Sequence, residues 1–295
     1  MARPDGSAAP RGIDIDPDDP AARAFLAFYR LLRRYHRHRV SGLEHVERLM
    51  ADGQRIVLVA NHALDVVDPL LFCAALFERT GRAPHFIGHA RGWFEVPGLR
   101  AISQRFGVIP ARRLEETVDA LRRDGLLMLY PGGNREAAMR SYRDEPYRLR
   151  WQDRTGFLRV ALEAEAQLVF VAAVGTDEAY YQSALPTPSG LTRWLDEDSG
   201  RYDGARLGFG LAGPHLVPGL FPLPVRITHT VSEPLELGDR ERARRDPRAL
   251  AALHAEISER CQKLLDAAVA RREDDADVVD RAVRGVQGWL QRVGL

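Results

Sequence analysis

Apolar and polar residues follow one another along this chain in blocks that predict strands alternating with helices. Short apolar runs of strand length occupy residues 55–62, 84–90, 126–133 and 167–175, and stretches with helical periodicity separate them. A later run, 222–237, predicts a strand pair or an extended segment. Strands separated by helices favour a parallel sheet that is buried on both faces. We therefore expect an α/β fold with a mixed, largely parallel sheet flanked by helices.

Amphipathic helices are predicted at both ends of the chain. In 21–39, apolar residues recur with helical spacing (Phe25, Phe28, Tyr29, Leu32), and basic residues repeat that spacing on another face (Arg30, Arg33, Arg34, Arg37). An apolar stripe beside a basic stripe is typical of a helix that lies on a membrane surface. An ordinary surface helix that packs on the core has the same pattern, and both interpretations stay open. Residues 277–295 predict a final amphipathic helix.

Composition limits the class of protein. The 295 residues are 45% apolar and 28% charged, with a net charge of +1, so the chain is globular and nothing favours a nucleic-acid partner. Two distant cysteines, Cys73 and Cys261, predict neither a disulfide framework nor a zinc site, so a reducing cytoplasmic compartment is expected. Residues 1–20 lack the apolar core of a signal peptide and predict a disordered tail. We expect one domain over 21–270 and a separate C-terminal helix over 271–295.

The first candidate for chemistry is a histidine and a carboxylate after the first apolar strand. His62 directly follows that strand, at the end where open α/β sheets place their ligands. Asp68 follows at a predicted helix start, where its carboxylate suits a helix cap or the role of orienting His62. Asp65 competes with Asp68 for that role. A His–Asp pair without a nucleophile suits deprotonation of a substrate hydroxyl.

The second candidate is a glycine corner, "YPGGNRE", after the strand at 126–133. Glycines let backbone approach a ligand, and the arginine that follows suits a phosphate. The predicted substrate-binding residues here are Gly132, Gly133, Asn134, Arg135 and Glu136. Arg135 and Glu136 also suit an ion pair that fixes the turn, and the two roles are compatible.

Together these motifs resemble the glycerolipid acyltransferase superfamily. "NHALDVVDPLLF" is similar to its first motif, with five residues instead of the usual four between His62 and the matched Asp68. "GVIPARR" resembles the second motif and places a basic residue, Arg113, for acceptor binding. "YPGGNRE" stands where the family commonly has Pro-Glu-Gly-Thr-Arg and is similar to its monoacylglycerol and diacylglycerol acyltransferase branch. The proline of the fourth motif is replaced at Ala172 or Ala173.

The resemblance implies an O-acyltransferase domain over 21–270 that works as a peripheral protein on the cytoplasmic face of a membrane. An acyl-CoA or acyl-carrier-protein thioester is the expected donor, a lipid hydroxyl the acceptor, and no metal or other cofactor is expected. In this reading His62 takes the acceptor proton, Asp68 orients His62, and backbone N–H groups at the corner support the thioester oxyanion. Gly132 in place of glutamate predicts a roomier pocket with one carboxylate fewer, which favours a neutral acceptor. A lysophosphatidic acid or other lysophospholipid acyltransferase is the first alternative, and a non-catalytic lipid-binding relative is the second.

Overall fold

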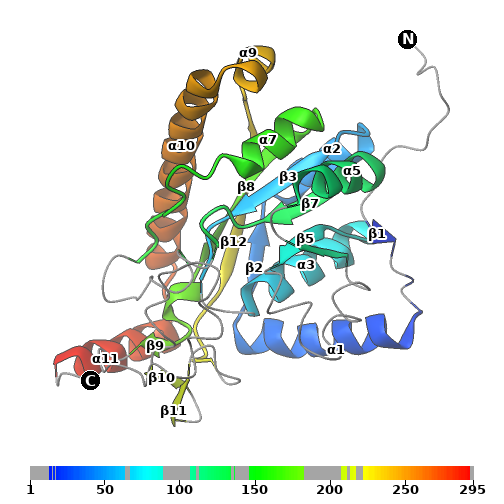
Figure 1. Ribbon diagram of the computed structural model, residues 1–295. Coiled ribbons are helices and arrows are strands. Elements are labelled where there is room, and N and C mark those ends of the chain that lie inside the picture. Colours follow the sequence, from blue (N-terminus) through cyan, green and yellow to red (C-terminus); the bar gives the residue numbers. More distant parts are fainter. Residues whose placement is uncertain are drawn as a thin grey trace.

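The structure, a computed structural model, contains a seven-stranded sheet with helices on both faces (Figure 1). It describes residues 13–14, 16, 18–63, 67–88, 107–110, 113–133, 136, 146–182, 207–210, 213–216 and 222–292. The sheet strands are β2 (Arg39–Ser41), β3 (Ile56–Ala60), β5 (His85–Gly88), β6 (Val108–Pro110), β7 (Leu126–Leu129), β8 (Gln167–Val174) and β12 (Thr228–Leu235). The helices in the described ranges are α1 (Pro20–Tyr35), α2 (Leu43–Ala51), α3 (Val67–Thr80), α5 (Leu114–Asp124), α7 (Gly156–Glu163), the 3-10 turn η2 (Thr176–Glu178), α9 (Arg240–Arg245), α10 (Pro247–Asp274) and α11 (Val278–Arg292).

The sheet is mixed and largely parallel. Its strand order is β2-β12-β8-β3-β7-β5-β6, and only the pairing of β12 with β8 is antiparallel. The central strand β3 is buried along its whole length, between β8 and β7. The fold class predicted from the pattern is thereby confirmed, and 222–237 supplies one long strand rather than a strand pair.

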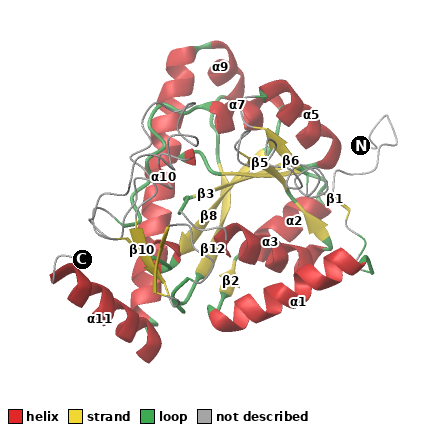
Figure 2. Ribbon diagram, turned by 60° about the horizontal axis from the view of Figure 1, so that its bottom comes forward, coloured by secondary structure: helices red, strands yellow, loops and turns green. Residues whose placement is uncertain are grey.

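Alternate residues of the central strands build a separate core on each face of the sheet. Val57 and Val59 of β3 point to the side covered by α5, α7, α9 and α10, whereas Ile56 and Leu58 point to the side of α2 and α3 (Figures 1 and 2). Because successive strand side chains point to opposite faces, a continuous apolar run is what a strand covered on both sides requires. The apolar runs of the sequence thus have their physical explanation in the two helical layers.

Five short strands of the described residues lie outside the main sheet. Strands β9 (Tyr181–Gln182), β10 (Leu207–Gly210) and β11 (Gly213–Leu216) form a small antiparallel sheet. Strand β1 (Ile13–Asp14) pairs with β4 (Arg82–Ala83). Two residues of the segment expected to be a disordered tail therefore form backbone pairs, which composition alone does not predict.

Helix α1 packs against α3, and it also exposes apolar side chains to solvent. It therefore agrees with both interpretations of its sequence, a helix packed on the core and a helix that lies on a membrane surface. Tyr29 is buried, and Phe25 and Leu32 pack beside it against the body of the domain. Phe28 and Leu31 point away and are 52% and 66% exposed. In the part of the chain that the structure describes, no helix combines the length and the apolar character needed to cross a bilayer.

Charged residues anchor α11 to the end of α1 and to the strand region before β12. Asp280 is fully buried; its Oδ1 lies 2.7 Å from Arg37 Nη2 and accepts the backbone N–H of Arg226 at 3.0 Å. Asp277 Oδ2 forms an ion pair with Arg37 Nε at 2.9 Å and accepts a hydrogen bond from Arg226 Nη2 at 2.9 Å. Asp277, directly before α11, and Asp280, in its first turn, therefore hold this helix against the rest of the domain.

Candidate active site

His62 lies two residues beyond the carboxyl end of β3, and the residue before it is firmly held. The side-chain amide of the fully buried Asn61 donates to the Ala173 carbonyl and accepts the Ala173 N–H, both at 2.8 Å. A proline at 173 has no N–H to donate. The alanine found at this place in the fourth motif therefore lets Asn61 fix the chain directly before His62.

Glu136 brings the histidine motif and the glycine corner together. Its fully buried carboxylate accepts the backbone N–H of His62 at 2.9 Å and that of Arg150 at 3.2 Å. The His62 ring lies against the ring of Tyr130, which follows β7, with the two centroids 4.5 Å apart. Because β3 and β7 are neighbouring parallel strands, their carboxyl ends place both motifs at one edge of the sheet.

The glycine corner is filled by this same carboxylate. A Cβ added at Gly132 would lie 1.8 Å from Glu136 Oε2 and 2.4 Å from Glu136 Cβ. Gly133 has a positive φ of 51°, and Arg154 Nη1 donates to the Gly132 carbonyl at 2.6 Å. The expectation of a roomier corner with one carboxylate fewer is therefore wrong, because Glu136 supplies a carboxylate in the space that a side chain at 132 would take.

Asp68 lies in the first turn of α3, where its carboxylate contacts a second histidine. Asp68 Oδ1 is 2.5 Å from His229 Nε2, and His229 Nδ1 is 2.7 Å from His38 Nε2. All three side chains are buried. Burial lowers the pKa of His229 to about 3, and burial together with the neighbouring His229 lowers the pKa of His38 to about 2. Both imidazoles are therefore neutral at neutral pH.

The other predicted site residues are only partly described. Arg113 lies just before α5, exposed, and its guanidinium donates to the Glu116 carboxylate at 2.9 Å. Asp65, Asn134 and Arg135 lie outside the described residues. The pairing of His62 with Asp68 and the roles given to Arg113 and Arg135 remain predictions.

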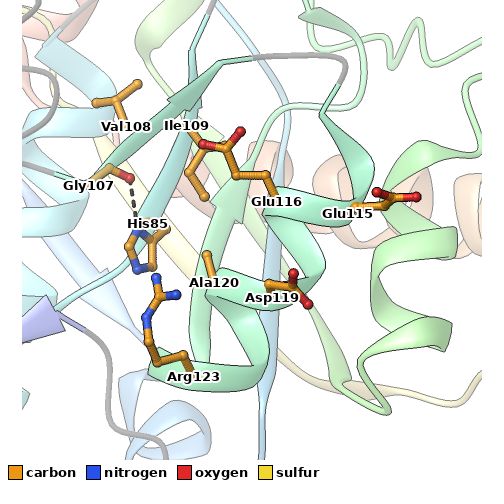
Figure 3. Close-up of a pocket in the computed structure, with 9 residues that line it drawn as sticks. All are labelled: His85, Gly107, Val108, Ile109, Glu115, Glu116, Asp119, Ala120 and Arg123. Atoms are coloured by element: carbon orange, nitrogen blue, oxygen red, sulfur yellow. Dashed lines mark hydrogen bonds between the residues drawn. The ribbon is translucent and has the colours of Figure 1, made fainter.

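A cavity of about 570 Å³ lies at the far edge of the sheet, beside the second motif. Residues of β5, β6 and α5 line it, including His85, whose Nδ1 contacts the Gly107 carbonyl at 2.9 Å (Figure 3). The other ring nitrogen of His85 lies 2.7 Å from Asp124. Strand β6 is three strands from β3, a separation of about 14 Å. The cavity is therefore distinct from the His62 site, and both nitrogens of His85 are engaged with protein atoms.

Sequence reasoning missed three residues that shape the site: Asn61, His38 and His229. The Asn-His pair directly after a buried strand is the signal that could have found Asn61. His229 is a buried position between the half-buried Thr228 and Thr230, a pattern that any strand residue facing a core shows, so its link to Asp68 needs the tertiary structure. Among the described residues, no group of histidine, cysteine and carboxylate side chains has the arrangement of a metal site.

The sequence of this region matches a protein-family model and several relatives that are named as lipid-synthesising enzymes. Residues 37–174, which include His62, Asp68 and the glycine corner, match the family model described as Acyltransferase. A "DGAT1/2-independent enzyme synthesizing storage lipids" is 32% identical over 142 residues in Gallus gallus and 29% identical over 168 residues in Homo sapiens. These matches cover 46% and 55% of this chain, and 38% and 47% of the relatives.

Two further similarities extend this set. "Phytyl ester synthase 2, chloroplastic" of Arabidopsis thaliana is 29% identical over 164 residues, which are 52% of this chain and 23% of that protein. The crystal structure of the 1-acyl-sn-glycerophosphate acyltransferase PlsC of Thermotoga maritima aligns over 84% of both chains, with a TM-score of 0.45 and 14% identity. The chain spans less than half the length of the curated relatives. Residues 37–174 form an acyltransferase-family domain, and the resemblance inferred from the motifs is confirmed.

Proposed function

We propose that the protein is an O-acyltransferase that moves a fatty acyl group from an acyl thioester, of CoA or acyl carrier protein, to the hydroxyl of a neutral lipid. The observation that carries this proposal is the hydrogen bond between Glu136 and the His62 N–H at 2.9 Å. It joins two motifs that lie 74 residues apart inside the segment that matches the acyltransferase family. An imidazole held at the carboxyl end of a central parallel strand is well placed to act as a general base.

In this mechanism the neutral imidazole of His62 takes the proton of the acceptor hydroxyl. The oxygen attacks the thioester carbonyl as that proton leaves, and the C–S bond breaks when the tetrahedral intermediate collapses. The imidazolium returns its proton to the departing thiolate, so His62 ends neutral. Asp68 stabilises the imidazolium, and no covalent acyl-enzyme forms. A base of this kind contributes about 10²–10⁴ in rate.

The neutral acceptor is supported by relatives whose names refer to storage lipids and phytyl esters. The alternative acceptor is lysophosphatidic acid or another lysophospholipid. Arg113 suits a phosphate, although its guanidinium contacts Glu116 in this structure.

Competition between diacylglycerol and lysophosphatidic acid for one labelled acyl-CoA, both presented on vesicles, tests the acceptor. We expect label mainly in triacylglycerol. Label mainly in phosphatidic acid would overturn the neutral acceptor and favour the alternative. Repeating the assay with acyl carrier protein as the carrier identifies the preferred donor.

We also propose that the protein binds peripherally to a membrane, on its cytoplasmic face. Supporting observations are the exposed apolar residues Phe28 and Leu31 on α1, and Trp289 on α11, which is 55% exposed. Helices α1 and α11 lie along the same end of the molecule (Figure 1). Arginine side chains next to apolar ones favour anionic lipid, and salt screens that attraction.

Vesicle sedimentation tests this proposal. We expect the double change Phe28→Ser and Leu31→Ser to weaken binding at least tenfold, because each buried apolar side chain contributes about 1.5–3 kcal/mol. Leu114→Ser, at an exposed apolar position on α5, is the matched control and should leave binding unchanged. Equal sedimentation of the wild-type chain, the double variant and Leu114→Ser would contradict a membrane role for α1.

A further inference from the structure

A continuous chain of buried hydrogen bonds runs from Asp68 to His229 and on to His38. The two contacts measure 2.5 Å and 2.7 Å, and each side chain is at most 4% exposed. The members come from three elements, namely α3, β12 and the turn between α1 and β2. His229 and His38 have no role in the acyl-transfer chemistry outlined above. The hydrogen-bond chain that they form nevertheless ends at Asp68, which is one of the predicted catalytic residues.

The carboxylate determines where the protons lie along this chain. Asp68 accepts, so His229 carries its hydrogen on Nε2, and its Nδ1 is the acceptor of the neutral ring. His38 must then donate through Nε2. No described residue offers a hydrogen-bond partner to His38 Nδ1, which is buried. The chain therefore runs in one direction, with both imidazoles donating toward Asp68.

We propose that His229, held in turn by His38, is a positioning residue that fixes the Asp68 carboxylate for acyl transfer. This inference rests on the proposed function. A carboxylate with one oxygen held by an N–H cannot rotate freely, so its other oxygen keeps a constant direction. A displacement of about 1 Å in such a supporting group can cost about 100-fold in rate.

The strand register also links His229 to the His62 side of the site. His229 lies opposite Ala173 in the β12–β8 ladder, and Ala173 is the residue that Asn61 holds by two hydrogen bonds. His229 and the chain before His62 are thus placed by the same backbone segment. This explains why a residue outside the matched segment 37–174 is built into the site.

Two substitutions at one position separate positioning from packing. His229→Gln keeps an N–H donor near the place of Nε2, and so keeps the bond to Asp68. His229→Asn keeps an acceptor near the place of Nδ1, and so keeps the bond from His38 but loses the bond to Asp68. We expect kcat to fall by about 10- to 100-fold in His229→Asn, and by only about three- to tenfold in His229→Gln, which loses the bond from His38 but keeps the bond to Asp68, with KM unchanged in both.

His38 and His36 provide a matched pair of second variants. Both are buried histidines near the end of α1, but His36 Nδ1 contacts the Val225 carbonyl at 3.0 Å rather than the Asp68 chain. His38→Ala removes the donor to His229 and should lower kcat by about three- to tenfold. His36→Ala should leave kcat within twofold of wild type, when both are compared per mole of folded protein.

The outcomes distinguish this inference from the function on which it rests. Thiol release from acyl-CoA by the full chain, abolished in His62→Ala, establishes the activity first. Equal losses in His229→Asn and His229→Gln, or in His38→Ala and His36→Ala, would overturn the positioning role while the activity stands. Absence of turnover in the wild-type chain with every acceptor tried would overturn the proposed function, and this inference with it.

Discussion

Gly132 is required because the Glu136 carboxylate fills the space beside it, and this can be tested directly. Gly132→Ala would place a Cβ 1.8 Å from Glu136 Oε2 and 2.4 Å from Glu136 Cβ. Contacts this short cannot be relieved by a small adjustment, so the glutamate must leave its place. It then gives up its bonds to the backbone N–H groups of His62 and Arg150.

The cost follows from these two bonds. A buried hydrogen bond to a charged group contributes about 1.5–3 kcal/mol, so the loss of both amounts to about 3–6 kcal/mol of the free energy of unfolding. Glu136→Gly, which removes the same carboxylate and also its Cβ, should cost a similar amount. In that background the three atoms nearest to the added Cβ are all gone, so the further cost of Gly132→Ala should be below about 1 kcal/mol. The two changes should therefore be strongly non-additive.

Urea unfolding of the two single variants and the double variant, followed by circular dichroism, measures this coupling. Gly81→Ala is not a suitable control because Gly81 has a positive φ of 68°; Gly156→Ala is suitable, since a Cβ there meets nothing within 4 Å. Additive losses in the double variant would refute the idea that Glu136 occupies the place of a side chain at 132.

Two further predictions concern stability. Burial also lowers the pKa of His36 to about 4 in the folded protein. The unfolded chain binds a proton to this histidine below about pH 6.5, whereas the folded chain does not until the pH is near 4. The free energy of unfolding should therefore fall as the pH falls below about 6.5. His36→Gln should reduce this slope by about 1.4 kcal/mol per pH unit in urea unfolding between pH 6.5 and 4.5, and an unchanged slope would count against a buried neutral His36. Asp280→Ala removes one of the two carboxylates that both Arg37 and Arg226 contact and should cost about 3–5 kcal/mol, whereas Asp119→Ala, at an exposed position on α5, should cost less than about 0.5 kcal/mol in the same assay.

The fold was predictable because its central strands are apolar on both faces. The runs that end at Ala60, Leu129 and Val174 are continuous, and only a strand covered by helices on both sides requires that. The short strand β2 and the helix α2 were missed, because three residues carry no periodicity and α2 has only two buried positions, Val46 and Leu49.

The candidate site was predictable only for residues that have a suitable chemical group and also directly follow a predicted strand. His62 and the glycine corner follow strands directly, so their places at one edge of the sheet follow from the strand order. The role of Glu136 depends on its side chain folding back beside Gly132. The spacing of residues in the sequence does not predict that conformation. The partner of Asp68 comes from β12, 161 residues away, so only the assembled sheet brings it into contact.

The central claim is that His62 acts as the base of an acyl transfer, and thiol release from acyl-CoA in the presence of vesicles with lipid acceptors measures it most directly. The account predicts acceptor-dependent release by the wild-type chain and a loss of at least about 100-fold in His62→Ala, with an unchanged circular dichroism spectrum. Release by His62→Ala at the wild-type rate would contradict the mechanism. No release by the wild-type chain with any acceptor would instead favour a non-catalytic lipid-binding protein.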